Sequence, residues 1–248
     1  MLQDIKTLIV VLTLGSFAFL FGQRIWLTVM SQEDFRRRRN IWYVLTIWAF
    51  LSPSFWLFCL IAIPIMVWAG QRDSNPLALY VFLLHIIPPV NFLVPMVGVN
   101  YLFDINNYRL LTLTILLPYS MKLRHIKNPG QPTHPGFGFP YFLIFCFSTI
   151  QIVQLVPFED PTNTFRRIFL MILDCFILIY AFSRGASSRS KIQEILGTYL
   201  LVLAVTAPIA LFEAARGWLL YQGMVERWGS PLASAYLMRG DALRAQLS

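Results

Sequence analysis

The sequence predicts an all-α polytopic membrane protein with about eight membrane segments, and three observations support this fold class. Hydrophobic residues make up 57% of the 248 residues and charged residues only 13%, whereas soluble domains average about 25% charged residues. The apolar residues occur in long runs, and about 17–25 apolar residues cross a bilayer as a helix. The basic residues cluster in short stretches between these runs, as they do in cytoplasmic loops.

The first two apolar runs predict three membrane segments. Residues 5–22 lack a preceding basic region and a following A-x-A cleavage site, which predicts a retained membrane segment rather than a cleaved signal peptide. Residues 41–69 are too many for one untilted span and few for two. Ser52-Pro53-Ser54 interrupts this run, and proline disfavours helix in the residue before it. We therefore predict two segments, 41–52 and 54–69.

The distribution of basic residues supports this helical hairpin. With two segments in 41–69, the predicted cytoplasmic loops hold twelve basic residues, and the outer loops hold four before residue 213. With one segment, the count becomes eight against eight. Because cytoplasmic loops carry the excess of Lys and Arg, the hairpin is favoured, with both termini outside. The twelve residues are Arg24, Arg36, Arg37, Arg38, Arg39, Arg72, Lys122, Arg124, Lys127, Arg184, Arg189 and Lys191.

Five further membrane segments are predicted over 77–98, 108–121, 138–156, 166–182 and 193–212. The prolines of 77–98 must bend or interrupt its helix, and 108–121 is long enough only with flanking polar residues. Residues 213–248 follow as an outer-face segment, the start of a periplasmic loop. No repeat or change of composition marks a second domain, so residues 1–248 form a single transmembrane helical domain.

The sequence lacks the motifs of several soluble enzyme classes. It contains no G-x-x-x-x-G-K-[ST], H-E-x-x-H, C-x-x-C or G-x-S-x-G pattern. The three histidines share no ligand spacing, so neither a metal nor a cofactor is predicted, and catalytic residues remain unknown. The net charge of +8 is located in the predicted loops, which argues against nucleic acid as a partner.

Two polar residues lie inside apolar runs. His85 is interpreted as a helix-packing hydrogen-bonding residue in preference to a proton relay. Asp174 costs about 2.5–3.5 kcal/mol in mid-span on insertion scales, so it should face a partner or a water-filled cavity. A structural hydrogen bond and a functional role are both open for Asp174. Residues 36–39, all arginine, are interpreted as a topological signal near anionic headgroups.

The last predicted segment, "FEAARGWLLYQGMVERWGSPLASAYLMRGDALRAQLS", carries Arg216, Arg227, Arg239 and Arg244. Nearby glutamates account for the first two by local pairing. A helix would separate Arg239 and Arg244 by about 140°, so a joint clamp needs a turn at Gly240. Guanidinium groups suit bidentate contacts with phosphate. A lipid-linked pyrophosphate is therefore one hypothesis for these two arginines, and a solvated loop or ordinary headgroup contacts are the alternative.

This segment resembles a periplasmic segment in some members of the bacterial O-antigen ligase and polymerase family. Residues 84–123, "LHIIPPVNFLVPMVGVNYLFDINNYRLLTLTILLPYSMKL", and 173–185, "LDCFILIYAFSRG", are similar to the same subgroup. The resemblance covers about residues 80–248. It implies a metal-independent, multi-pass protein of the bacterial inner membrane that transfers a glycan from undecaprenyl pyrophosphate. The acceptor would be lipid A core or another glycan, on the periplasmic face.

The resemblance also implies roles for particular residues. Arginines of the family bind the pyrophosphate, and Arg239 and Arg244 are the matching positions. A histidine on a later periplasmic loop acts as the base, but this chain has no histidine after His134. We therefore expect the chain to be an N-terminal portion of a longer protein. Two other classes stay open: a transporter or flippase-like carrier that uses Asp174, and a non-catalytic envelope scaffold.

Overall fold

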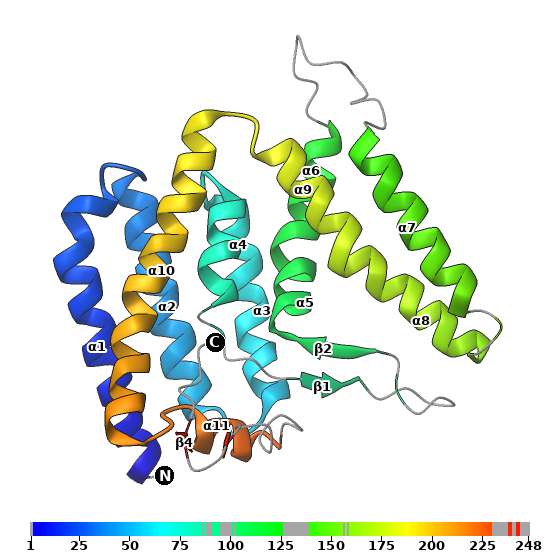
Figure 1. Cartoon of the computed structure of the whole chain (residues 1–248). Helices are drawn as coiled ribbons and strands as arrows, with labels where there is room; N and C mark the ends of the chain where they lie inside the picture. Colours follow the sequence, from blue (N-terminus) through cyan, green and yellow to red (C-terminus); the bar gives the residue numbers. More distant parts are fainter. Residues whose placement is uncertain are drawn as a thin grey trace.

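The computed structural model describes residues 2–85, 87, 91–94, 101, 103–125, 139–155, 157, 159–229, 238–239 and 242–243. It is mostly helical, which confirms the helical character of the predicted fold (Figure 1). The elements are α1 (Leu2–Trp26), α2 (Gln32–Leu51), α3 (Phe55–Arg72), α4 (Pro76–Leu84), β1 (Asn91–Leu93), β2 (Asp104–Asn106), α5 (Asn107–Leu111), η1 (Thr112–Leu116), α6 (Leu117–His125), α7 (Phe139–Leu155), α8 (Pro161–Met171), η2 (Ile172–Phe176), α9 (Ile177–Gly185), α10 (Arg189–Arg216), α11 (Gln222–Arg227), β3 (Met238–Arg239) and β4 (Ala242–Leu243).

The run 41–69 forms two helices, as the sequence predicts. Helix α2 ends at Leu51, and Ser52 has an extended backbone, with ψ of 127°. Ser54 is the N-cap of α3, where its side chain accepts a hydrogen bond from the amide of Leu57. Proline at position 53 and the capping preference of serine together account for the break.

The predicted segment 77–98 is corrected by the structure. Helix α4 ends at Leu84, and β1 follows at Asn91–Leu93, paired antiparallel with β2. The continuous helix therefore has nine residues, too few to cross a bilayer. Prolines at positions 88 and 89 cannot donate backbone hydrogen bonds to a continuing helix, which is the physical reason for its early end.

The other predicted segments lie within helices. Residues 108–121 belong to a helix that runs through α5, η1 and α6, and 166–182 to one that runs through α8, η2 and α9. Each contains one π-helical turn. Among the described residues, four helices are long and apolar enough to cross a membrane: Gln3–Trp26, Phe55–Arg72, Pro161–Gly185 and Arg189–Arg216. They indicate a membrane protein, while the number of about eight segments stays a prediction.

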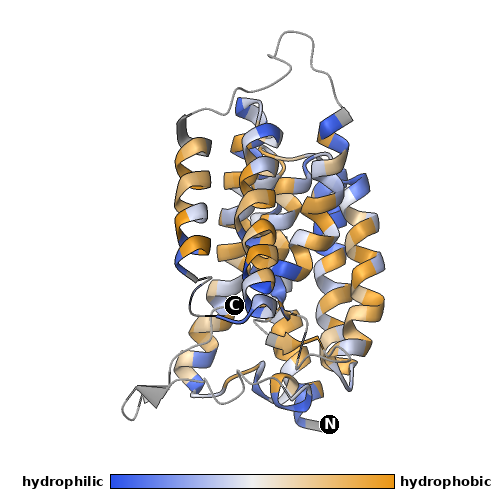
Figure 2. Cartoon of the chain, turned by 90° about the vertical axis from the view of Figure 1, so that its right-hand side faces the viewer, coloured by the Kyte–Doolittle hydropathy of each residue, from blue (hydrophilic) through white to orange (hydrophobic). Residues whose placement is uncertain are grey.

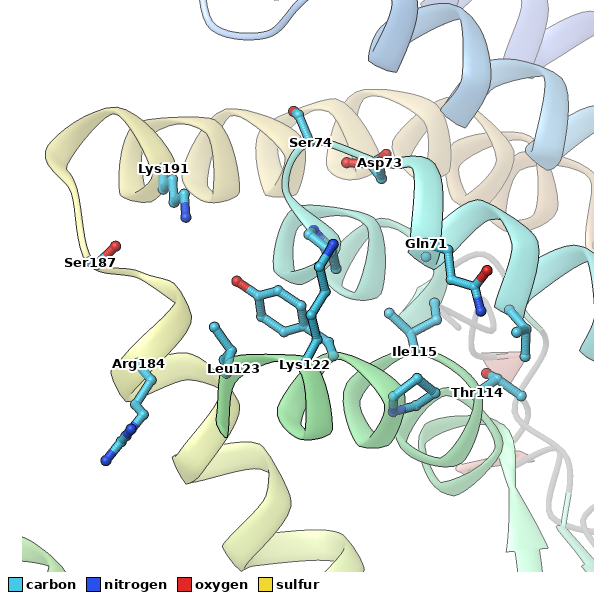
Figure 3. A pocket seen from close by; sticks show the side chains of 15 residues that line it. Gln71, Asp73, Ser74, Thr114, Ile115, Lys122, Leu123, Arg184, Ser187 and Lys191 are labelled. Carbon is cyan, nitrogen blue, oxygen red and sulfur yellow. The ribbon is translucent and has the colours of Figure 1, made fainter. Parts of the chain in front are cut away.

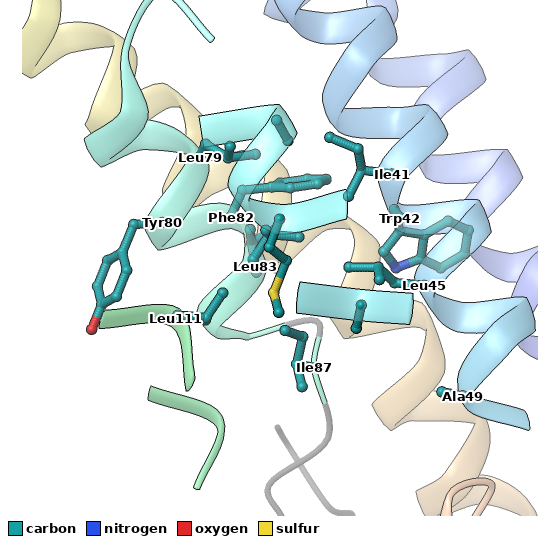
Figure 4. Close-up of a cluster of buried hydrophobic side chains, with 14 of the residues drawn as sticks. Ile41, Trp42, Leu45, Ala49, Leu79, Tyr80, Phe82, Leu83, Ile87 and Leu111 are labelled. Atoms are coloured by element: carbon teal, nitrogen blue, oxygen red, sulfur yellow. The ribbon is translucent and has the colours of Figure 1, made fainter. Parts of the chain in front are cut away.

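Helix α4 lies at the centre of the hydrophobic core (Figure 4). Its residues from Leu77 to Leu83 are buried, apart from the half-buried Val81. They pack against Trp42 and Leu45 of α2 and against Leu111 of α5. A helix that is apolar on all sides is stable only when neighbours surround it. The all-apolar sequence of α4 therefore agrees with its central position.

Large apolar side chains also cover much of the outer surface. In α7, Phe142, Phe147 and Val153 are exposed, and in α1 the exposed fraction of Phe21 is 79%. Coloured by hydropathy, the helices are mostly hydrophobic along their middle, and hydrophilic residues gather toward the two ends (Figure 2). Soluble monomers rarely expose apolar area of this extent, whereas the bilayer accommodates it.

The helices run between two ends of the bundle (Figure 1). The basic end comprises the α1–α2, α3–α4 and α9–α10 connections and the adjoining helix termini. The α11 end comprises the start of α1, residues 52–54, the β1–β2 hairpin and α11. Most basic residues of the predicted cytoplasmic loops lie at the basic end, which matches the predicted up-and-down order of the segments.

Candidate functional site

A buried ionic cluster lies at the basic end, and its centre is Arg38. This guanidinium is fully buried and donates to both carboxylate oxygens of Asp73, at 3.1 and 2.7 Å. It also donates to Glu194 at 2.6 Å and to the hydroxyl of Thr198 at 2.9 Å. Asp73 follows the last turn of α3, whereas Glu194 and Thr198 belong to α10. Arg38 thus joins α2, α3 and α10 through charged hydrogen bonds.

Asp34 extends this cluster along α2. Its carboxylate accepts hydrogen bonds from the hydroxyls of Ser31, at 2.6 Å, and Ser74, at 2.7 Å, and it pairs with Arg37 at 2.6 Å. Burial by itself would raise the pKa of Asp34, but the hydrogen bonds from Ser31 and Ser74 hold it below its ordinary value. Asp34 therefore stays ionised and fixes the α3–α4 connection against the start of α2.

Residues 36–39 were interpreted as a topological signal, and the structure corrects this interpretation at Arg38, which is buried in the cluster. These residues lie within a helix rather than a loop, because α2 begins at Gln32. Helical periodicity turns Arg38 toward the core, while Arg36 is exposed. Asp73 and Glu194 flank apolar runs in the sequence, which indicates that each needs a partner. Their positions in the sequence do not identify which arginine they contact.

Three carboxylates of this cluster could be considered as metal ligands. Oxygens of Asp34, Asp73 and Glu194 lie within 4.8 Å of one another. However, Arg38 already donates hydrogen bonds to two of them, so its positive charge takes the place that a cation would fill. The arrangement is that of a structural ion-pair network.

Asp174 has a partner that the sequence analysis did not identify. The Arg109 side chain donates to both of its carboxylate oxygens, with a closest nitrogen–oxygen distance of 2.7 Å. Arg109 also pairs with the carboxylate of Asp104 and donates to its carbonyl oxygen at 2.9 Å. The pair joins α5 to η2, and the adjoining π turns η1 and η2 contact each other. Asp174 thus faces an arginine, which supports the structural interpretation.

His85 lies at the end of a helix rather than in mid-span. It follows the last residue of α4, and its Nδ1 is 3.2 Å from the carbonyl oxygen of Val81. The imidazole ring meets the ring of Tyr199 edge-on, with centroids 5.5 Å apart. These contacts agree with the helix-packing interpretation. They also place His85 and Asp174 against different neighbours.

The α11 end is closed by contacts between distant parts of the chain. Arg227 pairs with Asp4 at 3.0 Å and donates to the carbonyl oxygen of Phe50 at 2.7 Å. The indole of Trp228 donates to the carbonyl oxygen of Ser52 at 3.1 Å. Local pairing with the adjacent Glu226 is therefore not the arrangement of Arg227. These contacts fix α11 across the ends of α1 and α2.

Of the two arginines of the pyrophosphate hypothesis, the structure describes only the backbone of Arg239. Arg239 is the second residue of β3, and it is paired antiparallel with Ala242 of β4. Gly240, where a joint clamp needs a turn, lies outside the described residues. Arg244 and the side chain of Arg239 lie outside the described residues.

Comparison with known proteins finds no match to a protein-family model, to a curated protein or to a solved structure.

Proposed function

We propose that this chain is the membrane part of a protein of surface-polysaccharide assembly, which transfers a glycan from undecaprenyl pyrophosphate to an acceptor. The proposal places the protein in the bacterial inner membrane, with about eight membrane segments and the α11 end on the periplasmic side. The acceptor would be lipid A core or another glycan. The resemblance to O-antigen ligases and polymerases supplies this reaction class.

The observation that carries the proposal is the distribution of basic residues between the two ends. At the α11 end, Arg227 forms an ion pair with Asp4. The basic end carries a surplus of cations, which favours a cytoplasmic location. The segment with Arg239 and Arg244 leaves the α11 end, so the proposal assigns pyrophosphate binding to these two arginines.

The chemistry needs a charged binding site more than a strong catalyst. Pyrophosphate is a good leaving group, so the protein must neutralise its charge, position the acceptor hydroxyl and provide a base. Two guanidinium groups fit the first task, because each can contact phosphate oxygens through two parallel hydrogen bonds. The proposal assigns no residue of this chain to the role of base.

The test is substitution of the arginines at the chromosomal locus. Arg239→Ala or Arg244→Ala should lower surface-polysaccharide display by about a hundredfold, as for loss of a group that stabilises transition-state charge. Membrane insertion should be unchanged, measured by protein level in the membrane fraction. Arg216→Ala is the matched control, since this residue lies exposed at the end of α10. Normal display in both test strains would refute the assignment.

The carrier alternative depends on Asp174, and the structure weakens it. A carboxylate that couples transport to an ion gradient has to exchange partners, whereas the Asp174 carboxylate holds three hydrogen bonds from Arg109. Loss of labelled-substrate flux in vesicles carrying Asp174→Asn, with the fold intact, would restore that alternative.

A further inference from the structure

A cavity of about 500 Å³ opens at the basic end, next to the Arg38 cluster. Helices α3, α6, α9 and α10, with η1 and the α3–α4 connection, form its walls (Figure 3). Its size lies within the range of small-molecule sites, about 300–1,000 Å³. Polar lining groups include Gln71, Ser74, Tyr119 and Ser187, which offer hydrogen bonds to a ligand with polar atoms.

Three cationic side chains from three different helices line the cavity. Lys122 comes from α6, Arg184 from α9 and Lys191 from α10. In Figure 3, Lys122 and Lys191 extend into the space between α6 and α10, while Arg184 extends away from it at the rim. Helices that are distant in the sequence thus bring positive charges to one space.

These cations are not neutralised by the protein. Within the described part of the chain, none of the three forms an ion pair with a carboxylate. Asp73 is the one acidic residue among the described lining residues, and its side chain is fully buried against Arg38. Like charges in a partly enclosed space repel each other, so an anion in the cavity would relieve this repulsion.

We propose that this cavity binds a phosphate ester, independently of the glycan-transfer function. The ligand class follows from the charges and donors: two inward cations, a third at the rim and hydroxyl groups match the oxygens of a phosphoryl group. The volume leaves room for the group esterified to it. Such a phosphoryl group can come from the headgroup of an anionic lipid or from a soluble phosphorylated compound at the basic face.

The soluble source is tested with glycerol 3-phosphate. Isothermal titration calorimetry is done on the purified chain in detergent at constant ionic strength. The affinity should fall at least about tenfold in the double variant Lys122→Gln/Lys191→Gln, because each lost charged hydrogen bond accounts for about that factor. Arg36→Gln/Arg189→Gln is the matched control. It removes the same charge from two exposed residues at the same end, and it should bind like the unmodified chain. Arg239→Ala should also bind normally, which separates this site from the pyrophosphate proposal.

The lipid source is tested by native mass spectrometry of protein released from nanodiscs. If the ligand is a headgroup, the unmodified chain and the control variant should retain phosphatidylglycerol from phosphatidylglycerol discs, and the Lys122→Gln/Lys191→Gln variant should lose it. Discs of phosphatidylcholine provide the zwitterionic reference. Binding of either probe that depends on Lys122 and Lys191 supports the proposal and identifies the source. Absence of both binding events, or equal weakening in the two double variants, overturns it.

Discussion

Replacement of Arg38 by methionine should be among the most destabilising single changes in this protein. Methionine keeps an apolar, unbranched stem but leaves the buried Asp73 carboxylate without the two hydrogen bonds that Arg38 donates. Breaking a buried ion pair in this way costs about 3–5 kcal/mol. Glu194 contributes less to the loss, because its side chain is 12% exposed and it also accepts a hydrogen bond from Asn75.

The assay is reversible unfolding of the purified protein in mixed detergent micelles, followed by tryptophan fluorescence. Arg36→Met is the matched control, because this arginine is exposed two residues earlier on the same helix. Its effect should stay within about 0.5 kcal/mol. A loss below about 1 kcal/mol for Arg38→Met, or equal losses for the two variants, would refute the argument that Arg38 neutralises the cluster.

Two further predictions concern helix packing and the second ion pair. A Cβ added at Gly15 would lie 2.2 Å from the ring of the buried Trp42, whereas one at Gly70 would lie 3.4 Å from the nearest atom. In the same unfolding assay, Gly15→Ala should therefore lower the free energy of unfolding by about 1–3 kcal/mol. Gly70→Ala should leave it unchanged or raise it by up to about 1 kcal/mol. Equal effects of the two variants would contradict the packing. Asp174→Asn should lower the free energy of unfolding by about 1–3 kcal/mol, because the contact with Arg109 is weakened. Polysaccharide display should persist in this variant. Loss of display in a stable variant would assign Asp174 a functional role.

The predictable parts of the fold are those that local chemistry determines. The break between α2 and α3 follows from Ser52-Pro53-Ser54, because proline and a capping serine act within a few residues of their own position. The end of α10 has a similar origin, since Gly217 adopts a left-handed conformation, with φ of 58°. The prolines of 77–98 predicted a bend or an interruption of its helix. Hydropathy records the apolar character of this run but does not show that the helix ends at Leu84.

The ion pairs could not be predicted because they depend on tertiary arrangement. Residues 38 and 194 are separated by 156 positions, and nothing in the sequence distinguishes Arg38 from its three arginine neighbours except the face of a helix that begins at Gln32. The same holds for Arg109 and Asp174, 65 positions apart. A charge within an apolar run predicts that a partner exists, but only the packed helices determine which residue it is.

The positions of these pairs explain how the helices keep one arrangement in a bilayer. Apolar side chains gain little by leaving lipid for each other, so specific helix association depends on close packing and on polar contacts. Here Arg38 joins α2, α3 and α10 at the basic end, and Arg227 joins α11 to α1 and α2 at the other. Close contacts such as Gly197 against Val29 bring α10 to the α1–α2 turn. These contacts at both ends hold α11 in a defined position relative to α1 and α2.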